Sequence, residues 1–412
     1  MKKNIYLLLI LFVVSCTKKN DFVQEIKINN DVPEVILPIL KNYSQSSYFL
    51  RETNIWLDLK VFSANTSNRD VPYNYYSLNT YVDLNNDGYD DILVAPIDNW
   101  HVGSTVPFKT FLNDKTNKNF IEDTTIIRNN IGMIGARKGV IGDLNGDKKP
   151  DIAFSEMGDD KPPFIGGKIG IVLSDKDGKY TFKYATNESW YSHGIASGDF
   201  DNNGTLDIFA TGPTKDPYPK LHFLINDGKG NFTDKNNIVK AKFTSYATTE
   251  FYDLNHDGFL DLFLGGNQET RLEPDNQPMR IFWGNGIDFD TTRSIILPNL
   301  ENWNVVVDIN FKDLDNDGVE EIILDRTSSN PSFYVGYRIQ VLKNNGNFSY
   351  SDVTDKTIEN YSNTTLKWMV WLKIGDIDKN GKLDIYDSDK GHWGSGNTLR
   401  WEQDTDGIFR KK

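Results

Sequence analysis

The sequence has few of the residues that build covalent cross-links and common catalytic centres. It contains one cysteine and five histidines among 412 residues, so an intramolecular disulfide is excluded. It also lacks a nucleophile elbow, a zinc motif and a phosphate-binding loop. Positive charge is in deficit as well, because the formal net charge is −13. We therefore expect no nucleic-acid partner.

Long apolar runs are also missing, and the run near the N-terminus is too short to cross a bilayer. This run extends from Ile5 to Val14 behind two lysines, a pattern typical of a secretory signal. It ends in VVSC, at Cys16, which resembles the lipobox of bacterial lipoproteins. The resemblance implies a signal peptide over residues 1–15, acylation of Cys16 and a tether over residues 16–30. Thr17, rather than aspartate, implies the outer membrane, on its periplasmic or surface side.

Helical periodicity is absent between residues 75 and 412, and a short acidic motif returns there instead. Successive copies begin 60, 56, 54, 60 and 63 residues apart. The copies are DLNNDGYDD at Asp83, DLNGDKKPD at Asp143, DFDNNGTLD at Asp199, DLNHDGFLD at Asp253, DLDNDGVEE at Asp313 and DIDKNGKLD at Asp376. Such regular spacing predicts a repeat protein.

A second repeat lies between the acidic motifs and has the pattern of a β-hairpin. It places an Asn/Asp/Gly turn between two apolar runs, as in FLINDGKGNFTD from Phe223 to Asp234. With the strand-like runs that flank each acidic motif, every period holds four short strands. We therefore predict an all-β fold, a β-propeller of four-stranded blades over residues 75–412.

The motif and its flanks resemble the FG-GAP repeats of integrin α-chain propellers and the VCBS repeats of bacterial exported proteins. The resemblance implies that each acidic loop joins the first, innermost strand of a blade to the second strand and holds calcium. Calcium prefers six to eight oxygen ligands. The expected ligands are the side chains at positions 1, 3, 5 and 9 of the loop and the carbonyl at position 7, with a sharp turn at position 6.

Applied to each loop, this pattern predicts up to six structural Ca²⁺ ions. The predicted ligands are Asp83, Asn85, Asp87, Tyr89 and Asp91; Asp143, Asn145, Asp147, Lys149 and Asp151; Asp199, Asp201, Asn203, Thr205 and Asp207; Asp253, Asn255, Asp257, Phe259 and Asp261; Asp313, Asp315, Asp317, Val319 and Glu321; and Asp376, Asp378, Asn380, Lys382 and Asp384.

Other metals fit these loops less well. An EF-hand needs an acidic residue at position 12, where the first loop has Val94. Magnesium demands strict octahedral geometry, and zinc and iron prefer histidine or cysteine. The second loop is the weakest, because Lys148 stands at position 6 where the others have glycine. A non-glycine residue with positive φ costs about 1–2 kcal/mol there.

The number of blades depends on the segment over residues 31–74. Six acidic loops require at least six blades, and KINNDVPEV, from Lys27 to Val35, lies one period before the first motif. Lys27 and Val35 replace the first and last carboxylates, so this copy cannot hold calcium. We favour seven blades with a degenerate N-terminal blade, and the alternative is six blades preceded by a cap.

Binding is expected on the face opposite the acidic loops, which carries the longer loops between second and third strands. We call it the loop-rich face. Its aromatic and histidine residues are candidates for stacking on a ligand or, alternatively, for packing between blades: Trp100, His101, Trp190, Tyr191, His193, His392 and Trp393. We therefore expect a monomeric, non-catalytic module that binds glycan or protein. The alternative is a carbohydrate-active enzyme, such as a polysaccharide lyase using His193 or His392 with Asp159 or Asp389.

Overall fold

The computed structural model describes thirteen stretches of the chain, which include most of the repeat region. They are residues 45–46, 77–96, 103–116, 120–159, 162, 165–212, 221–240, 246–266, 278–328, 335–369, 372–376, 380–387 and 399–412. The predicted signal peptide, Cys16, the tether and most of residues 31–74 lie outside them. Within these stretches, no helix is both long and apolar enough to cross a membrane.

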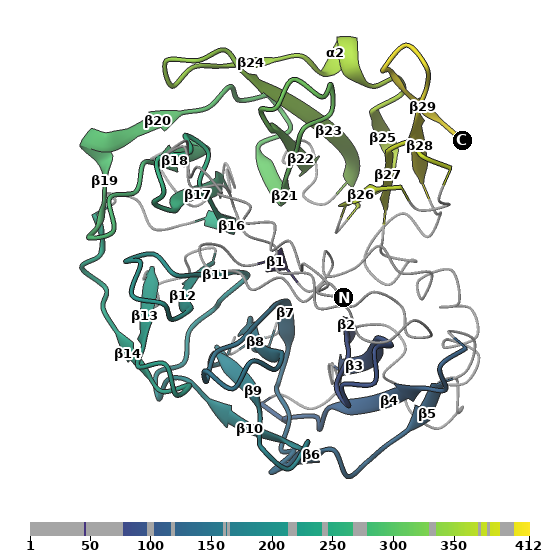
Figure 1. The fold of residues 1–412 in the computed structure, drawn as a ribbon. Coiled ribbons are helices and arrows are strands. Elements are labelled where there is room, and N and C mark those ends of the chain that lie inside the picture. Colours follow the sequence, from purple (N-terminus) through teal and green to yellow (C-terminus); the bar gives the residue numbers. More distant parts are fainter. Residues whose placement is uncertain are drawn as a thin grey trace, which may run out of the picture.

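The described residues form six sheets of four antiparallel strands, arranged around one axis as the blades of a β-propeller (Figure 1). The first three blades are β2 (Ser77–Val82), β3 (Asp91–Pro96), β4 (Lys109–Asn113) and β5 (Phe120–Glu122); β7 (Ala136–Gly142), β8 (Asp151–Glu156), β9 (Gly170–Ser174) and β10 (Tyr180–Tyr184); and β11 (Gly194–Gly198), β12 (Asp207–Thr211), β13 (His222–Asn226) and β14 (Phe232–Asp234).

The other three blades follow the same order from the axis outward. They are β16 (Tyr246–Tyr252), β17 (Asp261–Gly266), β18 (Arg280–Phe282) and β20 (Ser294–Ile296); β21 (Val305–Lys312), β22 (Glu321–Thr327), β23 (Val335–Asn344) and β24 (Tyr350–Asp352); and β26 (Leu372–Gly375), β27 (Asp384–Asp387), β28 (Arg400–Gln403) and β29 (Phe409–Lys411). The prediction of four strands per period is confirmed.

The second strand of a blade is buried on both of its faces. In β8, β12, β17 and β22 every residue is buried, because each blade is covered by a neighbour on either side. This explains why a segment such as DLFLGG in β17 reads as one short apolar run rather than as an alternating pattern.

Segments between blades attach the outer edges of neighbouring blades to one another. β6 (Ile127–Arg128) pairs in parallel with β10, and β15 (Val239–Lys240) pairs with β19 (Phe289–Asp290). Ile358 makes a parallel bridge to Phe409 in the same way. Each of these segments follows one blade and pairs with the outer part of the next blade. The remaining elements are η3 (Thr291–Arg293), α2 (Thr354–Thr357), β25 (Ser362–Lys367), which pairs with β23, and β1 (Gln45–Ser46).

Apolar clusters fill the junctions between blades, including the junction that closes the ring. Tyr386 of β27, in the sixth blade, packs in one buried cluster with Ile92 and Val94 of the first blade. Lys373 of β26 also lies over the ring of Tyr81 on β2, at 5.8 Å. The sixth blade therefore contacts the first directly.

The described residues thus form six blades, rather than the seven that we favoured from the sequence. β1, which belongs to the N-terminal segment, is not part of a separate four-stranded sheet. It pairs with β7, the innermost strand of the second blade. The physical reason for six blades is that the apolar faces of the first and sixth blades bury each other, so closure needs no intervening sheet.

Candidate metal centres

The six acidic loops occupy equivalent places at one end of the blades. Each begins directly after an innermost strand, at the residue following β2, β7, β11, β16, β21 or β26. Position 9 of each loop is the first residue of the second strand, from Asp91 in β3 to Asp384 in β27. The predicted placement between first and second strands is therefore confirmed, and it directs six sets of oxygen atoms toward one face of the propeller.

Each loop is folded around the carboxylate at position 1. This carboxylate accepts hydrogen bonds from the backbone N–H groups of positions 5 and 6. The two N···O distances are 3.0 and 2.8 Å at Asp83, 3.1 and 2.8 Å at Asp143, 2.9 and 2.9 Å at Asp199, 3.0 and 2.9 Å at Asp253, 3.2 and 2.9 Å at Asp313, and 2.9 and 2.8 Å at Asp376. All six loops therefore share this pair of hydrogen bonds.

Two residues in the loop have positive φ, although the sequence pointed only to position 6. Position 6 is left-handed in every loop, with φ of 89° at Gly88 and 67° at Lys148. Position 4 is also left-handed in the first five loops, as at Asn86, Gly146 and His256. Asparagine tolerates this conformation better than most residues, which accounts for its frequency there. The second loop keeps the common fold, and Lys148 is exposed.

The carboxylate at position 9 is buried in all six loops. Asp91 accepts the backbone N–H of Leu84 at 2.9 Å and that of Asn113 at 2.8 Å. Burial is nevertheless the largest effect on its ionisation and raises its pKa to about 7. Burial raises the pKa of Asp151 to about 7, and those of Asp207 and Asp261 to about 8. Charges at positions 1 and 5 raise the pKa of Asp91 further, so a nearby cation would favour the ionised form.

The second sequence repeat meets the acidic loop at this carboxylate, a contact that our sequence analysis missed. The last residue of the third strand, or in the fourth blade the second residue after that strand, donates its backbone N–H to position 9. This occurs at Asn113, Ser174, Asn226 and Gly284, with N···O distances of 2.8, 2.6, 2.8 and 2.9 Å. In the sequence, the donor and the position-9 acceptor are separated by 19 to 23 residues. This nearly constant separation could have indicated the contact.

Some of these residues at the third-strand end also bind through their side chains. The Ser174 hydroxyl donates to Asp151 Oδ1 at 2.7 Å and to Asp147 at 3.0 Å. The Asn226 side-chain amide donates to the carbonyl of Leu144, in the acidic loop of the preceding blade, at 2.8 Å. The loops are therefore connected to each other as well as to their own blades.

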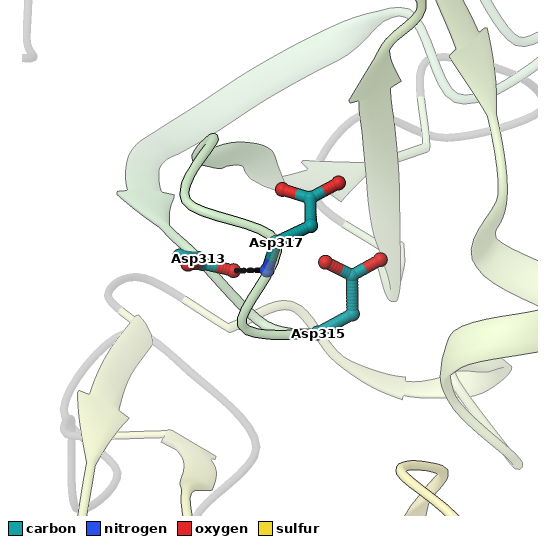
Figure 2. Close-up of side chains that lie close together, drawn as sticks. All are labelled: Asp313, Asp315 and Asp317. Carbon is teal, nitrogen blue, oxygen red and sulfur yellow. Dashed lines mark hydrogen bonds between the residues drawn. The ribbon is translucent and has the colours of Figure 1, made fainter.

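The fifth loop shows the most compact acidic group among the described residues. One oxygen from each of Asp313, Asp315 and Asp317 lies within 4.8 Å of the others (Figure 2). The ammonium of Lys343 contacts Asp315, and it lies 2.8 Å from Asp317 and 3.6 Å from Glu321. A cation is thus already attracted to this loop, and the oxygen-only donor set fits a hard ion such as calcium.

The sixth loop is described in part, because Asp378 lies outside the described residues. Its position 9, Asp384, lies 3.0 Å from the guanidinium of Arg400. Basic side chains therefore contact ligand carboxylates in the fifth and sixth loops, and they would compete with a metal ion there.

Three of the candidate ligand-binding residues are described, and of these Trp190 and Tyr191 are buried and His193 is half-buried. The side chains of Trp190 and Tyr191 are 3% and 6% exposed. The Trp190 ring packs between the second and third blades and stacks on His222, with ring centroids 3.6 Å apart. Tyr191 lies 5.3 Å from His193, ring to ring. The rings of Trp190 and Tyr191 therefore serve packing in this conformation.

The remaining candidates for the loop-rich face are not described. Trp100, His101, His392, Trp393 and Asp389 lie outside the described residues. Most of the loops that carry them, and most loops of that face, do so as well. Asp159 is described: its carboxylate accepts the backbone N–H of Gly103, which joins loops of the first and second blades.

Comparisons with known proteins agree with this architecture. The model of the FG-GAP-like repeat family matches residues 83–154 and 143–210. No curated protein matches the sequence. Among solved structures, the chain is similar to a lectin from Agrocybe aegerita, described as recognising non-reducing terminal N-acetylglucosamine. The TM-score is 0.46 and the identity 16%, over 80% of this chain and 71% of the lectin. We draw no functional argument from a likeness at this level.

Proposed function

Because the chain is a β-propeller in which residues 83–210 match the FG-GAP-like repeat family, we propose that it is a calcium-stabilised, lipid-anchored binding module that works outside the cytoplasm. The observation that carries the proposal is the common geometry of the six acidic loops. Each presents a position-1 carboxylate already oriented by two backbone N–H groups and a buried acidic residue at position 9. An ordinary surface turn does not need a buried carboxylate, because burying an unpaired charge costs free energy.

Calcium would be held by the side chains at positions 1, 3, 5 and 9 and by the carbonyl at position 7. When bound, it supplies the positive charge that these carboxylates otherwise lack. A ligand that binds only the folded state adds about 2.7 kcal/mol per site at one hundred times its Kd. For an exported protein without disulfides, several such sites would replace covalent cross-links.

Thermal unfolding with and without calcium tests the structural role of the metal. We expect the melting temperature to fall by more than about 10 °C when calcium is removed by a chelator, because several sites are lost together. Magnesium added in place of calcium should restore little of this loss. An unchanged melting temperature in the chelator would contradict the proposal.

Lipid anchoring rests on Cys16 and is tested separately. Growth with a labelled fatty acid should label the wild-type chain in the membrane fraction. The Cys16→Ser variant should carry no label and leave that fraction. Labelling that persists in the variant would place the lipid at another residue, and an unlabelled wild-type chain would contradict lipid anchoring.

The binding partner is proposed to be a glycan or a protein held by the loop-rich face, without catalysis. Support comes from a difference between the two ends of the blades. The acidic loops are uniform, whereas the loops of the other face differ in length and sequence. A glycan-array screen combined with an assay for unsaturated sugar products tests this. Binding without product formation supports a binding module, and product formation would identify a carbohydrate-active enzyme.

A further inference from the structure

Three acidic side chains that belong to none of the acidic motifs come together between the fifth and sixth blades. Asp308 lies on β21 and is the cross-strand partner of Asp325 on β22, so both side chains project from the same face of the sheet. Asp387 lies on β27 of the sixth blade, opposite Leu372. The backbone N–H of Leu372 donates to Asp308 Oδ2 at 3.0 Å. We call Asp308, Asp325 and Asp387 the interblade cluster.

The interblade cluster is buried, and within the described residues three oxygen atoms of Asp308 and Asp325 have no hydrogen-bond partner. Asp308 and Asp325 are 0% exposed and Asp387 is 1% exposed. Asp308 Oδ2 is held by Leu372 and by the side-chain amide of Asn310, at 3.1 Å. Asp308 Oδ1 and both carboxylate oxygens of Asp325 have no hydrogen-bond partner among the residues that the structure describes. One oxygen oriented by donors and one left free is the usual state of a carboxylate that ligates a metal.

Nearby positive charges in the described part of the chain form their hydrogen bonds with other groups, although the charge of Lys138 also acts on Asp308 and lowers its pKa. The ammonium of Lys138 contacts Glu250 and donates to the Thr249 carbonyl at 3.0 Å. The guanidinium of Arg326 donates to Gln340 and to the Trp303 carbonyl, both at 2.7 Å. Arg326 adjoins Asp325 along β22, so its side chain projects from the opposite face of the sheet.

The electrostatics of the cluster agree with a missing counter-charge. Burial raises the pKa of Asp325 well above its usual value, and the charges of Asp308 and Asp387 raise it further. Burial also raises the pKa of Asp308, to about 6. Lys138 compensates the charge of Asp308 only in part, so a proton or a cation would stabilise Asp308 and Asp325 buried side by side.

We propose that the interblade cluster binds one hard divalent cation of the calcium class, separate from the six loop sites. The ion would draw together carboxylate oxygens of Asp308, Asp325 and Asp387, which do not all lie within 4.8 Å of one another in the structure. The donor set contains oxygen alone, which excludes a preference for soft metals. The ion would join β21 and β22 of the fifth blade to β27 of the sixth. Asp325 and Asp387 lie toward the ends of their strands that lead to the loop-rich face, so the ion would stabilise the base of that face.

Metal content tests this proposal on the full chain. Wild type and Asp325→Asn are purified with calcium, passed through calcium-free buffer, and analysed for calcium per chain by mass spectrometry and by calorimetric titration. We expect Asp325→Asn to bind one equivalent less than wild type. The control is Asp159→Asn, also at a buried aspartate, whose carboxylate has a backbone partner and lies outside the cluster. It should bind as wild type does.

Two further outcomes keep the test decisive. If Asp325→Asn binds as much calcium as wild type and melts at a higher temperature, Asp325 is protonated in the native protein and the proposal is overturned. If Asp325→Asn does not fold, Asp387→Asn is measured in its place, with the same expected loss. Should the loops bind no calcium, wild type would hold a single equivalent, which the variant loses. Failure of the loop sites and failure of this site are thus distinguishable.

Discussion

Two sets of carboxylates in this propeller are buried away from water, and they differ in the groups that stabilise them. The position-9 carboxylates, such as Asp91 and Asp261, lie within nine residues of their partner ligands and accept backbone N–H groups. The interblade cluster joins residues from 308 to 387, and Asp325 accepts no hydrogen bond within the described residues. In the acidic loops, residues of one repeat thus supply the hydrogen bonds that stabilise a buried carboxylate. In the interblade cluster, where the carboxylates come from distant strands, stabilisation depends on a bound proton or cation.

Glu250 offers a third arrangement, in which an ammonium supplies the counter-charge. Lys138 of the second blade reaches Glu250 of the fourth blade past β11, whose sequence GIASG has mostly small side chains. Both side chains are buried. This pair shows what a buried carboxylate requires when no metal is involved, and it gives the largest predicted effect.

We expect Lys138→Met to lower the free energy of unfolding by about 3–5 kcal/mol, because it leaves Glu250 buried without its partner. The double variant Lys138→Met/Glu250→Gln should recover much of this loss. Urea denaturation in the presence of calcium measures both. If the single variant is as stable as wild type, buried carboxylates in this protein do not need a counter-charge, and the contrast between the two sets fails.

Asp261→Asn should cost about 1–3 kcal/mol, since it disturbs a buried acceptor of two backbone N–H groups. It should also reduce bound calcium by one equivalent. Asp227→Asn, in an exposed turn between the third and fourth strands of the third blade, is the matched control and should change neither quantity. If the two variants are equally stable in calcium, the position-9 carboxylate contributes no more to stability than an exposed aspartate does.

The stability of the calcium-free protein should fall as pH rises between about 4 and about 8. The pKa values of Asp151 and Asp261 are raised from 3.8 to about 7 and about 8, so the folded state binds more protons than the unfolded state in this window. With saturating calcium the trend should reverse, because the metal binds ionised carboxylates. Melting curves across this window check both signs, and a parallel pH dependence in the two conditions would contradict the assignment.

Lys148→Gly in the second loop should produce the smallest change, a gain of less than about 1 kcal/mol. The substitution relieves a φ of 67° at a non-glycine residue, and the greater freedom of glycine in the unfolded chain offsets part of the gain. Lys176→Gly, in an exposed turn without positive φ, should instead be slightly destabilising. Chemical denaturation resolves the difference, and equal effects would show that Lys148 is unstrained.

Much of the fold could be predicted because its information is local and repeated. Four strands per period, the hairpin turns and the acidic loops at the start of each second strand are all written within single repeats. The number of blades was harder, since the N-terminal segment matches the period at KINNDVPEV. The contact of Tyr386 with Ile92 and Val94, more than 290 residues apart, decided for six blades.

The candidate sites divide in the same way. The predicted loop ligands followed from motif and spacing, whereas the backbone donors at Asn113 and Ser174 required knowledge of which strand end meets which loop. Trp190 looked suited to stacking on a ligand, but its ring packs on His222. Sequence cannot separate an exposed aromatic residue from a buried one when both follow a strand.

The sequence by itself determined the repeat, the four strands of each repeat and the six loops in which several oxygen donors lie within nine residues. Only the tertiary structure decided how many blades close the ring and which distant acids share a buried space. The physical reason is range. Turn geometry and hydrogen bonds to nearby backbone act over a few residues and leave a motif, whereas packing between blades and the charge balance of Asp308, Asp325 and Asp387 arise only when the strands are brought together.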